Sequence, residues 1–266
     1  EDGEGVADTG DKVTITGENF GTDPSDISVS FNGTPAEFEL VDESTIVATT
    51  PADYQTGSVT VTIHGYTMTG GAMFNPNSKG DVTVLYLQNY KQPFAKANDE
   101  SWKNGEWWTP AVWNQNAASF NAKGNTTVSG MQYKSEEGLT LAFQNGWDKE
   151  AYTNGKMWQV ATLRPGKYRL EVTYAYTLVV TDAGNFISVL IAKGDSESDI
   201  PNVADLEQLN GVYVAYDKMG TANDSGTLVT PSFEVTETTD VVIGFLTSLA
   251  KGNSYFKVTE LKLILE

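Results

Sequence analysis

The chain has 266 residues, of which 39% are hydrophobic and 11% aromatic, enough to build folded cores and to exclude a mainly disordered state. Its formal net charge of −18 excludes nucleic acid and anionic membranes as main partners, because both need clustered lysine or arginine. The absence of cysteine excludes disulfide bonds and thiolate zinc sites.

The charge is uneven along the chain. Residues 1–76 hold thirteen Asp and Glu against the single Lys12, whereas residues 77–266 hold 22 acidic and 16 basic residues. An acidic, solvated surface is typical of an exported protein that must stay soluble. No apolar run approaches the roughly 20 residues that a membrane helix needs.

Apolar and polar residues alternate with period two through the first 75 residues. The clearest rows lie at residues 13–15, 27–31 and 59–63, each with apolar side chains on one face and hydroxyls on the other. Turn signals such as Asn32-Gly33 and Thr50-Pro51 separate them. Short alternating strands at this spacing predict a small antiparallel sandwich.

Three motifs in this segment resemble the IPT/TIG family of immunoglobulin-like domains: GDKVTITGENFG at residues 10–21, VSFNG at 29–33 and GSVTVT at 57–62. They occur in the family's order and cover about residues 5–75. The resemblance implies a spacer or interaction module of cell-surface proteins, without chemistry of its own. We therefore predict an IPT/TIG domain over residues 1–76.

The polar sequence NPNSKG at residues 75–80 marks the predicted domain boundary. Strands then resume, and we expect them at 82–86, 139–143, 168–176, 186–192, 212–216, 228–235, 241–246 and 255–265. In the third, Tyr168, Leu170, Val172, Tyr174 and Tyr176 form the inward row. In the last, the apolar parity changes, which predicts a β-bulge at Thr259-Glu260. Residues 203–209 are the one weak helical candidate.

Eight or more strands joined by loops predict a jelly roll over residues 77–266. The motifs NGKMWQV at 154–160, LRPGKYRL at 163–170 and YFKV at 255–258 resemble those of carbohydrate-binding jelly rolls with a galactose-binding-like fold. The segment is similar to the domains that follow TIG domains in surface glycan-binding lipoproteins of gut Bacteroidetes. The resemblance implies an all-β fold of two sandwiches, an immunoglobulin-like one followed by a jelly roll.

It also implies an extracellular location at the outer-membrane surface, with the export signal and lipid anchor outside these 266 residues. The implied partners are a polysaccharide or oligosaccharide and other outer-membrane glycan-uptake proteins.

Four tryptophans lie within twelve residues on a segment interrupted by glycine and proline, with amide side chains directly after them. A sugar stacks its apolar face on an indole ring while amides bond its hydroxyls. A second Trp–amide group lies at 144–148. The predicted ligand-binding residues are Trp102, Trp107, Trp108, Trp113, Asn114, Asn116, Asn145, Trp147 and Asp148. Core packing is the alternative for each of these tryptophans, and for Trp158, inside a predicted strand, it is the preferred interpretation.

No catalytic motif is present. His64 is the only histidine and lies at the end of a predicted strand, so it is interpreted as a solvated edge residue and no Ser-His-Asp triad has another base. No cofactor is expected except a structural calcium ion, which related sugar-binding jelly rolls often carry; Asp99 and Glu260 are the candidate ligands.

The leading hypothesis is a non-catalytic glycan-capture protein with the TIG domain as spacer. Two alternatives stay open. One is a structural or protein-interaction module whose tryptophans lie in the core, and the other is an accessory region of a glycoside hydrolase.

Overall fold

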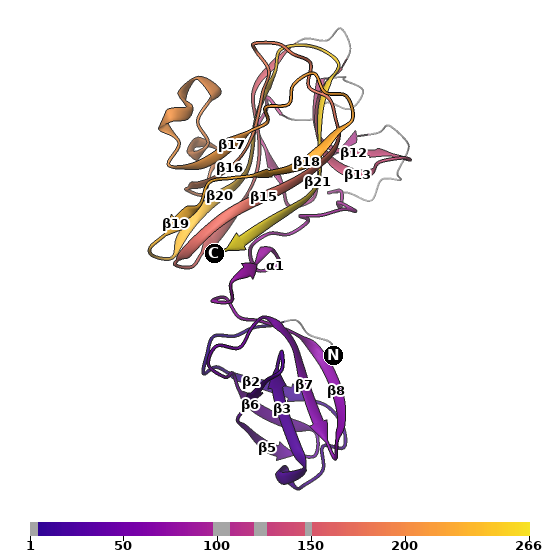
Figure 1. Cartoon of the computed structure of the whole chain (residues 1–266), viewed down its shortest axis with the longest axis vertical. Coiled ribbons are helices and arrows are strands. Elements are labelled where there is room, and N and C mark those ends of the chain that lie inside the picture. The colour runs from indigo at the N-terminus through magenta and orange to yellow at the C-terminus, as the bar shows by residue number, and fades with distance from the viewer. Residues whose placement is uncertain (1–4, 98–106, 120–126, 147–150) are drawn as a thin grey trace. The chain divides into compact units, whose positions relative to one another are not determined.

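The computed structural model describes residues 5–97, 107–119, 127–146 and 151–266 (Figure 1). The chain is all-β and divides into two compact units, Glu1–Leu85 and Tyr86–Glu266. The predicted boundary between residues 76 and 77 precedes this division. In the part of the chain that is described, no helix is both long and apolar enough to cross a membrane.

The first unit is an immunoglobulin-like sandwich of two sheets. One sheet has the order β1-β8-β7-β3-β4 and the other β2-β6-β5. The strands are β1 (Gly5–Val6), β2 (Lys12–Thr16), β3 (Ile27–Phe31), β4 (Thr34–Ala36), β5 (Phe38–Asp42), β6 (Thr45–Thr49), β7 (Gly57–Ile63) and β8 (Tyr66–Phe74), and the 3-10 turn η1 spans Pro24–Asp26. The two-residue strand β9 (Gly80–Asp81) belongs to neither of these sheets. The three predicted rows of alternating residues are therefore strands.

The core of this unit forms where the inward faces of both sheets meet. Phe31 and Tyr54 are fully buried and pack edge to face with their ring centroids 5.4 Å apart. The Tyr54 hydroxyl donates to the carbonyl oxygen of Phe74 at 3.2 Å, so the buried phenol keeps a hydrogen bond. His64 and Gly65 both have positive φ, 49° and 84°, as a two-residue hairpin turn between β7 and β8 requires.

The second unit is a jelly-roll sandwich. Its first sheet has the order β10-β12-β13-β21-β15-β18, with β19 also paired to β15, and its second sheet has the order β11-β14-β20-β16-β17. The strands are β10 (Trp107–Trp108), β11 (Asn114–Gln115), β12 (Thr127–Lys134), β13 (Gly138–Asn145), β14 (Tyr152–Leu163), β15 (Gly166–Thr177), β16 (Phe186–Lys193), β17 (Gly211–Ala215), β18 (Asp224–Val229), β19 (Phe233–Val235), β20 (Thr239–Leu249) and β21 (Ser254–Leu265).

Aromatic rings fill the space between these two sheets. Phe143 of β13 lies 4.8 Å from Phe245 of β20, centroid to centroid, and Phe256 of β21 lies 5.3 Å from Tyr174 of β15. All four side chains are buried. Between β14 and β20 the backbones approach so closely that a Cβ on Gly244 would lie 2.1 Å from the carbonyl oxygen of Met157, so only glycine fits there.

The outer face of the second sheet carries its own small apolar cluster. Trp158, Leu190 and Val242 point outward from β14, β16 and β20, and Ile200 packs on them from the connection between β16 and β17. That connection holds the 3-10 turns η2 (Glu197–Asp199) and η3 (Val203–Gln208). The predicted core position of Trp158 is confirmed, and the weak helical signal at residues 203–209 corresponds to η3.

Three expectations for strands are wrong, each for a local reason. Residues 82–86 do not form a strand, because the Asp81 carboxylate accepts the Thr83 amide at 3.0 Å and starts the short helix α1 (Thr83–Tyr86). Tyr176 leaves the inward row because its φ is 52° and the pairing of β15 with β18 shifts register there.

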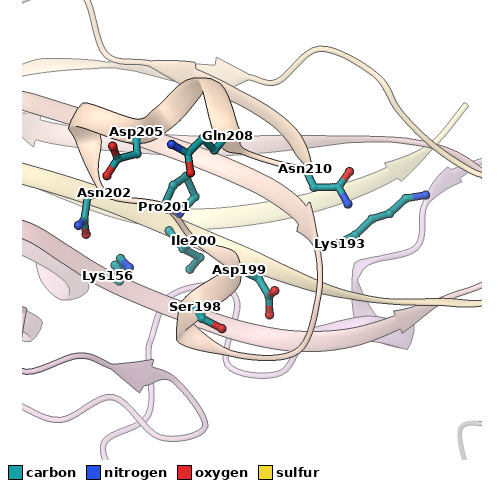
Figure 2. Close-up of a pocket in the computed structure, with 10 residues that line it drawn as sticks. All are labelled: Lys156, Lys193, Ser198, Asp199, Ile200, Pro201, Asn202, Asp205, Gln208 and Asn210. Atoms are coloured by element: carbon teal, nitrogen blue, oxygen red, sulfur yellow. The ribbon is translucent and has the colours of Figure 1, made fainter.

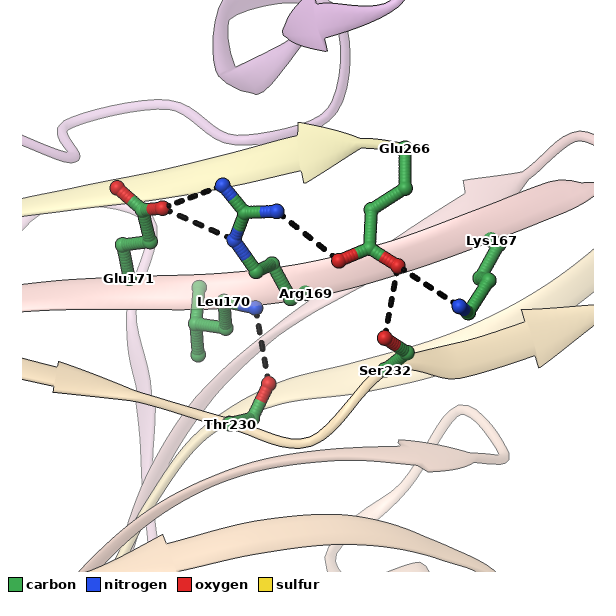
Figure 3. A network of polar contacts seen from close by, with 7 residues as sticks. All are labelled: Lys167, Arg169, Leu170, Glu171, Thr230, Ser232 and Glu266. Atoms are coloured by element: carbon green, nitrogen blue, oxygen red, sulfur yellow. Dashed lines mark hydrogen bonds and ion pairs between the residues drawn. The ribbon is translucent and has the colours of Figure 1, made fainter.

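The third is the strand expected at 228–235, which is interrupted between β18 and β19. Pro231 has no amide hydrogen to donate, and the hydroxyl of Thr230 accepts the Leu170 amide at 3.0 Å in place of a backbone partner (Figure 3). The predicted bulge in the last strand is confirmed, because Thr173 pairs with Glu260 and Tyr174 with Val258, leaving Thr259 as the extra residue.

A polar network ties β15 to the end of β21 (Figure 3). The Glu266 carboxylate accepts from Arg169 at 2.9 Å and from the Ser232 hydroxyl at 2.7 Å, and it lies 3.3 Å from the Lys167 ammonium. These hydrogen bonds, that of Ser232 foremost, lower the pKa of Glu266 to about 2.

We predict that Glu266→Gln removes an acid-dependent part of the stability. A carboxyl whose folded pKa is depressed stabilises the fold above its ordinary pKa, near 4.5, and this contribution disappears as the pH falls toward 2. Denaturant unfolding at pH 7 should therefore show a less stable variant, and the gap to wild type should close between pH 4.5 and 2. Glu237→Gln, at an exposed position, is the control and should show no such gap.

Candidate functional site

The segment predicted to carry the ligand site crosses from one sheet of the jelly roll to the other. Trp107 and Trp108 form β10 at the edge of the first sheet, where Trp107 pairs with Gln132. Asn114 and Gln115 form β11 at the edge of the second sheet. Those of the predicted residues that are described are therefore distributed over both sheets and the core between them.

Trp108, Trp113 and Asn145 lie in the interior, which corrects their predicted role as exposed ligand contacts. Trp108 is 3% exposed and Trp113 is 5% exposed. The Trp113 ring lies 5.9 Å from Phe245, and its indole NH donates to the carbonyl oxygen of Asn89 at 3.0 Å. Asn145 is fully buried and donates its amide to the Leu249 carbonyl at 3.0 Å. The core-packing alternative holds for both tryptophans, because closing the open edge of the sandwich buries large apolar rings.

Asn114 and Asn116 lie on or beside the second sheet. Asn114 is exposed and pairs with Trp158. Asn116 holds the local backbone: its oxygen accepts the Lys156 amide at 3.0 Å, and its amide donates to the Asn154 carbonyl at 2.8 Å and to the Glu197 carboxylate at 3.2 Å. Its side chain is thus engaged within the protein.

Trp107 lies on the outer face of the first sheet, together with polar residues of the neighbouring strands. Strand alternation places Met131, Leu141 and Phe256 in the core. Gln132 of β12, Thr140 of β13 and Lys257 of β21 occupy the opposite face, and the first two are direct cross-strand partners. We call Trp107, Gln132, Thr140, Tyr255 and Lys257 the β12–β13 face.

Two side chains of this face are buried without satisfying their hydrogen-bonding groups. Gln132 is 4% exposed and Thr140 is 1% exposed. Among the described residues, the Oε1 atom of Gln132 and the Oγ1 atom of Thr140 have no hydrogen-bond partner. Because each unpartnered buried polar group costs about 1–3 kcal/mol, native proteins seldom keep one without a ligand, an ion or a water molecule beside it.

An ion-pair cluster borders these two oxygens. The buried Lys257 ammonium pairs with the Glu137 carboxylate, which lies 3.6 Å from Lys134 as well. Both lysines lie over the Tyr255 ring, Lys257 at 5.2 Å and Lys134 at 6.0 Å from its centroid. Burial lowers the pKa of Lys257, while the Glu137 carboxylate opposes that shift. The face therefore combines two partly buried rings with fixed donors and acceptors.

Gln132, Thr140, Tyr255 and Lys257 were not among the predicted site residues. Their sequence signal is the ordinary polar half of an alternating strand. What distinguishes Gln132, Thr140 and Lys257 is their deep burial on the outward face, which depends on packing and is not visible in the alternation.

The predicted roles of the remaining residues, in ligand binding and in calcium binding, stay predictions. Trp102, Trp147, Asp148 and Asp99 lie outside the described residues. Glu260, the other candidate calcium ligand, lies 3.7 Å from the Lys262 ammonium. No group of three or more His, Cys, Asp or Glu suited to a metal occurs among the residues with described positions, and the calcium ion stays a prediction.

His64 is an edge residue, as predicted. Its side chain is 68% exposed, and Nδ1 lies 3.4 Å from a carboxylate oxygen of Asp26 in the first unit. It lies in a hairpin turn at the surface.

Comparison with protein families places both units. A family described as "Domain of unknown function (DUF5013)" matches residues 88–244, more than half of the chain, and the chain belongs to this family. The IPT/TIG domain matches residues 4–78, which confirms the interpretation of the first segment.

Several solved structures are similar to the chain. SGBP-B from a complex xyloglucan utilization locus in Bacteroides uniformis is 14% identical, with 97% of this chain and 70% of that chain covered and a TM-score of 0.30. TmCBM61 in complex with β-1,4-galactotriose is 12% identical, covering 68% and 98%, with a TM-score of 0.35. The CBM22-1 xylan-binding domain of Paenibacillus barcinonensis Xyn10C is 12% identical, covering 64% and 97%, with a TM-score of 0.36.

Similarity at these TM-scores does not indicate a ligand. The evidence for a ligand therefore comes from this chain's own residues. A search of curated proteins finds no match.

The different burial of the tryptophans gives a stability prediction. Trp113→Ala should cost about 3–5 kcal/mol of unfolding free energy, because it removes a ring packed in the core and a hydrogen bond. Trp107→Ala should cost much less, since Trp107 is only half-buried. Urea unfolding followed by circular dichroism measures both, and equal losses would contradict the placement of Trp107.

Proposed function

We propose that this protein is a non-catalytic glycan-binding protein of the cell surface, which holds a polysaccharide or oligosaccharide on the β12–β13 face. In this proposal the TIG domain is the spacer. One observation carries it: the unpartnered oxygens of Gln132 and Thr140 are buried on the same sheet face as Trp107 and Tyr255.

A sugar suits this combination of groups. A sugar hydroxyl that reached the Gln132 or Thr140 oxygen would give it the donor that the described residues do not supply. The apolar face of a pyranose ring can stack on Trp107, which is half-buried and so anchored by packing while part of it stays accessible. Sites for small ligands generally join aromatic surface to a few fixed polar groups in this way.

The alternative of a structural or protein-interaction module expects tryptophans in the core. Among the described tryptophans of the predicted site, the burial of Trp108 and Trp113 agrees with it. A purely structural role leaves the two unpartnered oxygens without an account, because an apolar residue at either position would avoid their desolvation cost. The glycan proposal explains why polar residues occupy these positions. Binding per sugar unit should be modest, since association also orders the flexible glycan.

Two matched variants test the proposal. Gln132→Leu removes an unpartnered oxygen, so it should keep or raise the free energy of unfolding and should weaken glycan binding. Gln159→Leu is the control: this buried glutamine donates to the Gln88 carbonyl at 2.7 Å and accepts the Gln88 amide at 3.1 Å, so its loss should destabilise the fold and spare binding. Isothermal titration against a panel of plant and host polysaccharides measures affinity, and chemical denaturation measures stability.

Trp107→Ala should weaken binding of the same glycan roughly tenfold or more, the effect of removing an interface anchor worth about 1.4 kcal/mol or more. The proposal is wrong if no glycan in a broad panel binds. It is also wrong if Gln132→Leu and Trp107→Ala both bind as wild type does.

A further inference from the structure

A pocket of about 380 Å³ lies on the outer face of the other sheet, under the connection that carries η2 and η3 (Figure 2). Its wall is polar and includes Lys156, Lys193, Asn202, Asp205, Gln208 and Asn210. Figure 2 draws Lys156 and Asn202 toward one end and Lys193 and Asn210 toward the other. The β12–β13 face belongs to the opposite sheet, so the two sites are separate.

The walls of the pocket are fixed before any ligand binds. Ile200 lies on the outer apolar cluster with Trp158 and Leu190. The Asp199 carboxylate accepts the Ser196 hydroxyl at 2.7 Å and the Asp195 and Ser196 amides at 3.0 Å, which closes the turn at η2. Such preorganisation reduces the entropy that a ligand would lose on binding.

Lys156 is the unusual member of the wall. Alternation along β14 places it on the outward face with Trp158, yet it is only 7% exposed. Its ammonium donates one long hydrogen bond, 3.4 Å, to the carbonyl oxygen of Glu197. Among the described residues no carboxylate lies within ion-pair distance of it. Burial lowers the pKa of Lys156, and the nearby Glu197 charge offsets part of that shift.

A buried ammonium with unused donors is costly unless an anion meets it. Asp199 does not supply this anion, because its carboxylate already accepts the hydrogen bonds that close the turn at η2. The amide side chains of Asn202, Gln208 and Asn210 make no hydrogen bond within the described part of the protein, so they are free to bind hydroxyls. The pocket thus offers one buried cation and a row of amides.

We propose that this pocket binds an acidic sugar unit, a uronic acid, whose carboxylate meets Lys156 and whose hydroxyls meet the amides of Asn202, Gln208 and Asn210. The proposal goes beyond glycan capture on the β12–β13 face and does not depend on it. It assigns the protein a second, charge-selective subsite.

The test uses the whole chain and small probes. Methyl glucuronide and methyl galacturonide are titrated by NMR against methyl glucoside and methyl galactoside, with acetate as a carboxylate without a sugar. At least one uronide should bind tighter than its neutral counterpart and tighter than acetate. Lys156→Met should weaken uronide binding roughly tenfold to a hundredfold, the effect of losing a hydrogen bond to a charged group. Lys251→Met, at an exposed position, is the matched control and should bind as wild type.

Asp205→Asn provides a second variant, at a half-buried position in the pocket wall, should Lys156→Met fail to fold. It removes a negative charge from the same pocket and should tighten uronide binding. Equal binding of acidic and neutral sugars would overturn the proposal, as would acetate binding as tightly as the uronides. Unchanged uronide affinity in folded Lys156→Met, or weaker affinity in Asp205→Asn, would overturn it too. Trp107→Ala should leave uronide binding in this pocket intact. A failure of the uronide proposal can therefore be told apart from a failure of the glycan proposal on the β12–β13 face.

Discussion

The contact of Phe143 with Phe245, 4.8 Å between ring centroids, is the constraint on which the second unit depends. It joins β13 of one sheet to β20 of the other, and both side chains are fully buried. Once the inward positions of these strands are fixed, alternation sends Gln132, Thr140 and Lys257 to one outer face. It sends Lys156 and Trp158 to the other. Both candidate sites therefore follow from the packing between the sheets.

The same packing explains where the tryptophans of residues 107–115 lie. The chain at residues 107–115 leaves the edge of one sheet and joins the edge of the other, so it passes the open side of the sandwich. Trp113 turns inward onto Phe245, whereas Trp107 remains on an outer face beside Gln132. Neighbouring tryptophans lie on different faces because Trp107 and Trp108 alternate within β10, whereas Trp113 directly precedes β11 of the other sheet.

Much of the fold could be predicted from period-two alternation and turn residues. The rows at 27–31 and 59–63 are strands, and the parity change in the last strand identified the bulge at Thr259. Alternation failed where side chains compete with the backbone: Asp81 starts α1, and Thr230 with Pro231 interrupts a strand. The deep burial of Gln132 and Lys156 could not be predicted, because it depends on tertiary packing and not on the local alternation of residues.

We propose that glycan binds on the β12–β13 face. The most direct measurement is an NMR titration with indole and side-chain amide signals assigned, using the oligosaccharide that binds best in a panel. We expect the signals of the Trp107 indole and the Gln132 side-chain amide to shift together along one binding curve, while the signal of the buried Trp113 indole does not shift. Saturable glycan binding with Trp107 and Gln132 unmoved would contradict it.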